Sequence, residues 1–257
     1  MTDITRFKAI FSGLDIAYGT YKIESSRGDG KQAGKAVVVR KPPTDDLWVK
    51  HLEGVEPSLG IIPIRADNMC IWGCIDIDQY PLDHAGLIKK IRGLELPLVV
   101  CRSKSGGTHV FLFTSEPIAA ADMQRYLKAC AAILGEAGRE IFPKQAEILV
   151  DRGDTGNFLN LPYFGGDQTM RYAILDDGSA ATLDEFYGLY EKFVQGPELE
   201  FPEKPKEPEH PIKDGPPCLQ ALCSQGVPEG TRNNALDRKS TRLNSSHSQQ
   251  SRMPSSA

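Results

Sequence analysis

The sequence predicts an α+β fold, and three observations lead to it. Residues 69–175 alternate short apolar strands with helical patterns in the order strand-helix-strand-strand-helix-strand. That order is typical of a small α+β sandwich with one sheet, helices on one face, and the other face open for a ligand. A length of 257 residues suits one core or one domain plus an appendage, and 40% hydrophobic and 25% charged residues are typical of globular proteins.

The first 68 residues predict an α/β unit that precedes this sheet. Phe7, Ile10 and Phe11 are spaced like one face of a helix. The other expected elements are a helix at residues 47–52 and strands at 18–23, 36–40 and 60–64. The first two strands flank a glycine-rich loop at residues 26–30.

The central region supplies the predicted sheet. Its strands and extended pieces are expected at residues 71–78, 97–103, 108–113, 140–145 and 158–163. Its helices are expected at residues 82–92 and 119–135. A further helix is expected to begin after Thr182, because Thr182 and Glu185, three residues later, match a capping box.

Composition divides the rest of the chain. We expect one folded domain over residues 1–194 and an extended Pro/Glu/Lys-rich linker over residues 195–217. Residues 218–236 begin with a short amphipathic segment. Residues 237–257 have almost no apolar content, as in a disordered tail. We favour an artefactual tail, because it looks like translated sequencing-adapter sequence joined to a truncated reading frame.

Composition also excludes several classes of protein. No apolar run approaches the ~20 residues of a membrane span, and the N-terminus lacks the features of a secretory signal. The six cysteines are scattered through apolar segments, which favours reduced core thiols in a cytoplasmic protein over a disulfide framework. Cys70 and Cys74 have a tolerable zinc spacing, but no second Cys/His pair completes four ligands.

Charge is unevenly distributed along the chain. A net charge of −4 is unlike that of a simple nucleic-acid coat protein. Basic residues nevertheless gather in two places, at Lys22, Arg27, Lys31, Lys35, Arg40 and Lys41, and at Lys89, Lys90 and Arg92. These clusters are either solvated surface or contacts to a phosphate backbone, and the sequence favours neither.

The strongest chemical signal is a pair of carboxylates at the end of a predicted strand. Asp76 and Asp78 are two residues apart, so their side chains project from the same face. Two carboxylates on one rigid surface are what a divalent-metal site requires. The alternative is an acidic pair that faces solvent, but Trp72, Ile75 and Ile77 mark the strand as buried.

A second signal is the turn before another predicted strand. The sequence there is Arg102-Ser103-Lys104-Ser105-Gly106-Gly107-Thr108-His109. The hydroxyls and backbone amides of such a turn can bind an anion, and Arg102 or Lys104 could neutralise it. Together with the carboxylate pair, this turn suggests metal-dependent phosphoryl or nucleotidyl transfer.

These stretches, taken in order, resemble the archaeo-eukaryotic primase superfamily. The segments that carry the resemblance are Asp76-Ile77-Asp78, Ser105-Gly106-Gly107-Thr108-His109, Phe142-Pro143-Lys144-Gln145 and Gly156-Asn157-Phe158-Leu159-Asn160-Leu161-Pro162-Tyr163-Phe164. A lone Asp-x-Asp is weak evidence, whereas the ordered set is specific. The chain looks most like the primase domain of TOTE conflict systems and related phage or plasmid primase-polymerases, over roughly residues 5–190. This implies a primase fold with an RRM-like catalytic sheet.

The resemblance implies roles for individual residues. Asp76 and Asp78 would bind two divalent ions, Mg²⁺ or Mn²⁺, and His109 would contact the phosphates of the incoming nucleotide. The other expected nucleotide contacts are Arg102, Ser103, Ser105, Gly106, Gly107, Lys144, Gln145 and Asn157. The alternative for His109 is a hydrogen-bonded structural histidine, and for Lys144 it is a surface position at a strand end.

The third carboxylate that is usual in this family is not uniquely matched. Glu140 and Glu147 are equally good candidates, and Asp151 is a weaker one. Glu140 lies in the expected extended piece, whereas the other two follow in an expected turn.

Polar and aromatic residues near the end of the resemblance also have two interpretations. Asn157 and Asn160 either hydrogen-bond a sugar or cap turns. Tyr163 and Phe164 either stack on a base or belong to the core, and the core is the commoner place for strand aromatics.

The resemblance implies a DNA primase or primase-polymerase domain, which joins nucleoside triphosphates on a single-stranded DNA template and releases pyrophosphate. The alternatives are a polymerase that only extends chains, and a non-catalytic single-strand-binding or replication-initiator module. Intact Asp76, Asp78 and His109 argue against the second. Residues 218–236 resemble the cut-off start of a helical region that often follows such domains. The sequence leaves open ribo- or deoxynucleotide preference, a replicative helicase as partner, and a phage, plasmid or defence setting.

Overall fold

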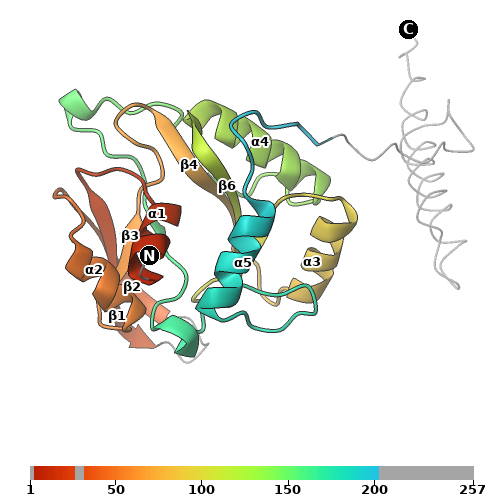
Figure 1. Cartoon of the computed structure of the whole chain (residues 1–257). Helices are drawn as coiled ribbons and strands as arrows, with labels where there is room; N and C mark the ends of the chain where they lie inside the picture. The colour runs from red at the N-terminus through yellow and green to blue at the C-terminus, as the bar shows by residue number, and fades with distance from the viewer. Residues whose placement is uncertain (1–2, 27–31, 203–257) are drawn as a thin grey trace, which may run out of the picture. The chain divides into compact units, whose positions relative to one another are not determined.

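Two four-stranded antiparallel sheets form the framework of residues 3–26 and 32–202, which the computed structural model describes (Figure 1). Helices pack around both sheets, which confirms the predicted α+β class. These residues belong to one compact unit. Most of the expected linker, residues 218–236 and the tail lie outside the described residues.

The first sheet has the strand order β2-β1-β3-β8. Its strands are β1 (Tyr18–Ser26), β2 (Gln32–Val39), β3 (Ser58–Ile61) and β8 (Leu159–Asn160). Two helices accompany it, α1 (Asp3–Ile10) and α2 (Asp45–Leu52). The N-terminal α/β unit is therefore confirmed, but its last strand comes from a distant part of the chain.

The second sheet has the strand order β5-β6-β4-β7. Its strands are β4 (Met69–Ile77), β5 (Val99–Arg102), β6 (Thr108–Ala119) and β7 (Glu140–Phe142). Helix α3 (His84–Gly93) links β4 to β5, and α4 (Ala120–Ile133) links β6 to β7. This is the split βαβ arrangement of ferredoxin-like and RRM-like domains, so the expected RRM-like sheet is present.

Proline residues explain why two strands are shorter than predicted. The extended piece expected at residues 140–145 ends as β7 at Phe142, because Pro143 has no N–H for a ladder hydrogen bond. The strand expected at 158–163 is reduced to β8 and pairs with β3 of the first sheet. Pro162 again interrupts pairing, and Tyr163 adopts a left-handed φ of 59°.

Both faces of the second sheet are covered, which corrects the expectation of an open face. On one face, Ile75 and Val110 pack with apolar residues of α3 and α4. On the other, Trp72, Phe111 and Phe113 pack with Phe7 of α1, with Phe11 just after that helix, and with Phe186 of the last helix. The second face carries large aromatic side chains, and burying them stabilises a second layer.

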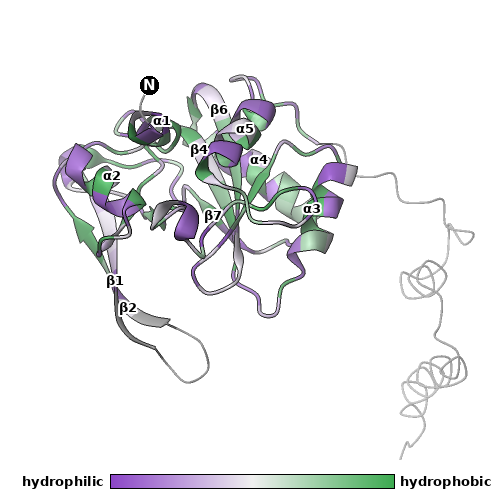
Figure 2. Ribbon diagram, turned by 60° about the horizontal axis from the view of Figure 1, so that its bottom comes forward, coloured by the Kyte–Doolittle hydropathy of each residue, from purple (hydrophilic) through white to green (hydrophobic). Residues whose placement is uncertain are grey.

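The last helix, α5 (Leu183–Phe193), begins at the predicted capping box. The Glu185 backbone N–H donates to Thr182 Oγ1 at 3.2 Å, and the Thr182 N–H donates to Glu185 Oε2 at 2.8 Å. Figure 2 shows hydrophilic and hydrophobic residues side by side along the helices, as expected where one face is buried. In α5 the buried face carries Phe186 and Tyr187.

Two compositional predictions concern cysteines and membranes. The cysteines in the described ranges, Cys70, Cys74, Cys101 and Cys130, are buried and free, as expected of reduced core thiols. Within the same ranges, every helix is too short or too polar to cross a bilayer.

Candidate active site

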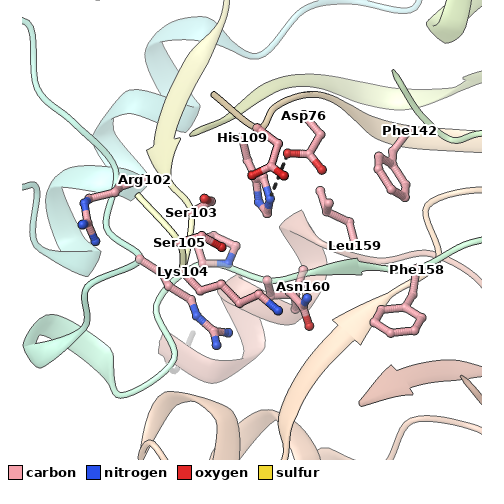
Figure 3. A pocket seen from close by; sticks show the side chains of 14 residues that line it. Asp76, Arg102, Ser103, Lys104, Ser105, His109, Phe142, Phe158, Leu159 and Asn160 are labelled. Carbon is pink, nitrogen blue, oxygen red and sulfur yellow. Dashed lines mark ion pairs between the residues drawn. The ribbon is translucent and has the colours of Figure 1, made fainter. Parts of the chain in front are cut away.

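Asp76 lies between two polar residues of the neighbouring strands. Antiparallel pairing sets Asp76 of β4 opposite His109 of β6 and, on its other side, opposite Glu140 of β7. Directly opposed residues share a face of the sheet. The His109 Nε2 atom lies 3.6 Å from Asp76 Oδ1, as the dashed line in Figure 3 marks. The register alone therefore brings a carboxylate, an imidazole and a second carboxylate into one row.

Asp78 follows the last residue of β4 and is exposed, whereas Asp76 is largely buried. The two carboxylates nevertheless line the same cavity. The hydroxyl of Tyr80 donates a hydrogen bond to Asp78 Oδ1. Tyr80 thus restrains the outer carboxylate, and sequence reasoning missed this contact because it depends on the conformation of a loop.

The turn between β5 and β6 is closed by its own backbone. The Ser103 N–H donates to Gly107 O at 2.9 Å, and the Gly106 N–H donates to Ser103 O at 3.1 Å. Gly106 has a φ of 93°, which favours glycine. A Cβ on Gly107 would lie 2.5 Å from the carbonyl oxygen of Ile77, so only glycine lets the turn approach the end of β4. The Gly106 amide is therefore used inside the turn, and its expected contact with a nucleotide stays a prediction.

A cavity of about 240 Å³ lies where β4, β6 and this turn meet residues of the first sheet. Figure 3 shows Asp76 and His109 on one side of it and Lys104 and Asn160 on the other. The residues that line it are Asp76, Asp78, Arg102, Ser103, Lys104, Ser105, His109, Phe142, Phe158, Leu159, Asn160, Leu161, Pro162 and Arg171. The cavity therefore has carboxylates at one wall and cations at another.

The carboxylate wall carries uncompensated negative charge. Burial, and next the nearby charges of Asp78 and Glu140, raise the pKa of Asp76 to about 6. Burial and the two like charges disfavour the ionised form of the Asp76 carboxyl group. A cation bound beside it would stabilise that ionised form. The register, the burial and the charges thus agree that positive charge is favoured beside Asp76.

The opposite wall is rich in basic groups that repel one another. Burial, and next the charge of Arg171, lower the pKa of Lys104 to about 8. Burial, with Arg171 and then Lys104, lowers the pKa of His109 to about 4. His109 is therefore neutral at pH 7, so its contact with Asp76 is not an ion pair at that pH. The Lys104 ammonium also lies over the ring of Tyr21 in β1, 2.9 Å from its centroid.

The candidates for the third carboxylate are placed very differently. Glu140 stands beside Asp76 in the sheet, and its Oε2 lies 2.7 Å from Lys144 Nζ. All three are exposed and absent from the cavity lining, but of the three Glu140 alone lies in a strand paired with the one that carries Asp76. Within the described ranges, no three His, Cys, Asp or Glu side chains converge closely enough to hold a metal ion. The ion pair with Lys144 gives a reason, since it engages the carboxylate of Glu140.

Five residues expected to touch the nucleotide lie outside the cavity lining, namely Gly106, Gly107, Lys144, Gln145 and Asn157. Lys144 pairs with Glu140, as described above. Gln145 Nε2 donates to Asn157 Oδ1 at 2.6 Å, and the Asn157 N–H donates to Gln145 Oε1 at 3.2 Å. The reciprocal pair ties the segment after β7 to the segment before β8, which is the structural alternative for both residues.

The aromatic residues after β8 are also mainly structural. Tyr163 is fully buried, and its hydroxyl contacts Ala181 O at 3.0 Å, Thr182 O at 3.1 Å and the Ala173 N–H at 3.1 Å. These contacts place Tyr163 in the core. Phe164 packs edge-on against His51 and is not part of the cavity lining.

Arg171 and Phe158 line the cavity although sequence reasoning did not assign them to it. Arg171 is only 7% exposed. The Phe158 ring lies on Gly19 and Gly60, which are cross-strand neighbours, and a Cβ on either would approach it within 2.3 Å. A single arginine in a polar loop and two distant glycines carry no local signal, so only the fold could reveal these contacts.

The strand order of the second sheet, with aspartates, a histidine and a Ser/Gly turn at one end, defines a domain of the archaeo-eukaryotic primase class. A family model described as the TOTE conflict system archaeo-eukaryotic primase domain matches residues 26–191, more than half of the chain. The chain therefore belongs to this family, which is one of primase-like nucleotidyltransferases. No curated protein matches the chain.

Proposed function

We propose that this domain joins nucleotides on a single-stranded DNA template, as a primase or primase-polymerase. The observation that carries the proposal is the register that places His109 and Glu140 on either side of Asp76 at a polarised cavity. A nucleoside triphosphate with divalent ions has matching polarity, because its metal-bound end suits carboxylates and its phosphate tail suits cations. In the reaction, a 3′-hydroxyl displaces pyrophosphate from the incoming nucleotide.

The chemistry of the donor set suits Mg²⁺ or Mn²⁺. Asp76 and Asp78 supply hard carboxylate oxygens, and burial together with like charges raises the pKa of Asp76 to about 6. Two such ions would stabilise the charge on the attacking and leaving oxygens. Glu140 would join the set by exchanging its ion pair with Lys144 for an ion beside Asp76.

The other cavity residues would bind and orient the nucleotide. Neutral His109 can donate an N–H to a phosphate oxygen without carrying a charge of its own. The hydroxyls of Ser103 and Ser105 line the same cavity and can donate in the same way. Lys104 and Arg102 would neutralise part of the phosphate charge. Positioning of this kind supplies much of the catalysis in phosphoryl-group chemistry.

The template would lie against basic residues outside the cavity. Lys22 and Lys35 are exposed and stand directly opposite each other across β1 and β2. Like charges in that arrangement are destabilising unless something neutralises them, and DNA phosphates would do so. This pair supports single-stranded DNA as the partner of the domain.

The test replaces Asp76 and Asp78 with asparagine in one variant. We expect nucleotide incorporation on single-stranded DNA, measured with and without a primer in Mg²⁺ and in Mn²⁺, to fall by several orders of magnitude. Affinity for single-stranded DNA should persist or rise, because two negative charges are lost. A matched control is Asp45→Asn with Asp46→Asn, which removes two exposed carboxylates from α2.

Two results would contradict the proposal. The first is wild-type protein that is inactive under every metal and primer condition yet binds DNA as the Asp76/Asp78 variant does. That result would favour a non-catalytic single-strand-binding or replication-initiator module. The second is equal loss of incorporation in the control variant, which would point to a general effect of charge.

A further inference from the structure

Arg171 is a buried cation whose guanidinium has a free nitrogen beside the cavity. The residue is 7% exposed, and it lines the cavity. Its Nη1 atom is buried and has no hydrogen-bond partner. Across residues 3–26 and 32–202, no carboxylate lies within the 4.0 Å ion-pair distance of this guanidinium.

Arg92 shows how the same fold satisfies an arginine with a structural role. Its guanidinium lies over the Phe193 ring, 4.0 Å from the centroid. Its Nε also donates to Asp176 Oδ1 at 2.6 Å, and its Nη1 donates to Leu98 O at 3.0 Å. Arg171 has a similar ring contact, with Phe164 at 5.1 Å, but it forms no ion pair within the described residues and its Nη1 has no hydrogen-bond partner.

A buried cation without an ion pair destabilises the free protein, because it has lost water and the charge of Glu56, which lies beyond ion-pair distance, compensates only in part. Burial accordingly lowers the pKa of Arg171 to about 10. Such a residue is understandable if a bound anion supplies the missing partner. The cavity also holds an unpaired buried acceptor, Asn160 Oδ1, which a hydrogen-bond donor and not an anion would satisfy.

The electrostatic neighbours of Arg171 locate this free group within the cavity. Its charge acts on Lys104, which lies across the cavity from Asp76, and on His109, which lies beside Asp76. The carboxyl of Asp76 is influenced by Lys144 and Lys104, and Arg171 is not among its causes. Arg171 therefore acts mainly on the basic groups of the cavity.

We infer that Arg171 binds the terminal phosphates of the incoming nucleoside triphosphate and makes the site selective for a polyphosphate tail. This inference rests on the proposed function, which places the reacting phosphate beside Asp76. The planar guanidinium offers several N–H donors, which suits phosphate oxygens. A DNA backbone phosphate is a poorer candidate, because Arg171 is buried within a cavity of about 240 Å³.

The experiment compares Arg171→Met with Arg92→Met, which remove a buried and a half-buried arginine and keep much of the apolar length. Binding of the tri-, di- and monophosphates of adenosine and deoxyadenosine is measured by calorimetry with Mg²⁺. The free energy of unfolding is measured without nucleotide. Affinity for single-stranded DNA is measured in parallel.

We expect Arg171→Met to weaken triphosphate binding by about ten- to a hundredfold and to leave monophosphate binding unchanged. Its stability should equal or exceed that of the wild type, because an unpaired buried charge is removed. Arg92→Met should lose stability and keep its nucleotide affinities. Arg171→Lys should recover only part of the triphosphate affinity, since lysine lacks the planar fork.

Several outcomes would overturn the inference. These are unchanged triphosphate affinity in Arg171→Met, a loss that is equal for mono- and triphosphate together with lower stability, or a loss confined to DNA affinity. Wild-type protein that binds no triphosphate would overturn it as well. Wild-type protein that binds triphosphate through Arg171 but incorporates none would instead overturn the proposed function and leave this inference standing.

Discussion

Asp76 owes its position to the residues that precede it on the same face of β4. Trp72 and Cys74, four and two positions earlier, are fully buried in the aromatic layer between the second sheet and α1. Because side chains alternate along a strand, anchoring these two residues also determines where Asp76 points. The carboxylate is therefore held by the packing of its neighbours, which limits its freedom before any ligand binds.

The first prediction distinguishes the two candidates for the third carboxylate. Glu140→Gln should lower nucleotide incorporation by at least tenfold, because Glu140 stands beside Asp76 in the sheet. Glu147→Gln should leave it unchanged, because Glu147 lies outside the strands of the sheet that carries Asp76. Both variants lose one charge and keep their shape, so each controls for the other in an incorporation assay. A larger loss in Glu147→Gln would assign the role to Glu147.

His51 is a buried histidine whose proton position follows from its partners. The Leu59 N–H donates to its Nδ1 at 3.1 Å, so Nδ1 is the unprotonated nitrogen. Its Nε2 lies 2.8 Å from Pro162 O and donates to it. Burial lowers the pKa of His51 to about 4. Protonation at Nδ1 would break the bond to Leu59 and would place an unpaired charge in the core.

The second prediction follows from that pKa. Unfolded His51 takes up a proton near pH 6.5, whereas the folded residue does so only near pH 4. Between these values the unfolded state binds more protons, so stability falls as the pH falls. His51 should contribute a loss of about 2 kcal/mol between pH 7 and pH 5.

Denaturant unfolding at several pH values checks this prediction. His51→Asn keeps an acceptor for the Leu59 N–H and cannot titrate, so its stability should vary less with pH than that of the wild type. An NMR titration of the wild type should show an imidazole pKa below 5 for His51. A titration near pH 6.5, or identical pH dependence in both proteins, would refute the assignment.

At the scale of elements, two glycines of the first sheet form a surface without side chains on which one aromatic ring packs. Gly19 of β1 and Gly60 of β3 are cross-strand neighbours, and the Phe158 ring lies on both. Asn160 of β8 is the next neighbour of Gly60 in the sheet. The absence of two side chains thus lets Phe158 and Asn160 reach the cavity from the first sheet.

The third prediction concerns this glycine pair. Gly60→Ala would place a Cβ 2.3 Å from the Phe158 ring, so the ring must move and stability should fall by about 1–3 kcal/mol. Gly188→Ala is the matched control, because a Cβ there meets nothing within 4 Å in helix α5. That change should stabilise the protein by about 0.5–1 kcal/mol. Thermal or denaturant unfolding of both variants checks the opposite signs.

The elements that could be predicted are those with a strong local pattern. Strand β4 is a continuous apolar run, and α5 begins at a capping box, so both were recognisable from neighbouring residues. The partner of β8 was not, because strand pairing depends on contacts between distant residues. A two-residue strand has too few side chains to indicate which sheet it joins.

Some residues of the candidate site could likewise be predicted from local motifs, and others could not. Asp76, Asp78 and His109 sit in motifs with a recognisable spacing, and the structure brings them to one cavity. Lys144, Gln145 and Asn157 lie in equally distinctive motifs but are engaged in ion pairs or hydrogen bonds with the protein itself. Their residue types could not reveal those partners, because a polar side chain in a motif can bind either a ligand or a neighbouring side chain such as Glu140 for Lys144 and Asn157 for Gln145.

At the scale of the whole molecule, the cavity takes residues from both sheets. Asp76 and His109 come from the second sheet, and Asn160 comes from the first. Helix α5 joins the aromatic layer through Phe186. The site therefore depends on the packing of residues that span the described part of the chain.

The fourth prediction concerns the end of the chain. Ending the protein after residue 236 should leave the melting temperature and activity unchanged, because residues 237–257 have almost no apolar side chains to bury. Ending it after residue 182 should lower the melting temperature sharply, because this removes the buried Phe186 and Tyr187. A clear loss of stability or activity in the longer variant would show that the tail belongs to the working protein.

The late arrival of β8 has a consequence for synthesis on the ribosome. Gly60 and Asn160, which pair between β3 and β8, are 100 positions apart. At a translation rate of about 5–20 residues per second, the free edge of β3 waits roughly 5–20 s for its partner. During that time its unpaired N–H and C=O groups can capture another chain. Dividing the chain anywhere between β4 and β7 would separate strands of both sheets. The two sheets must therefore be expressed and engineered as one polypeptide.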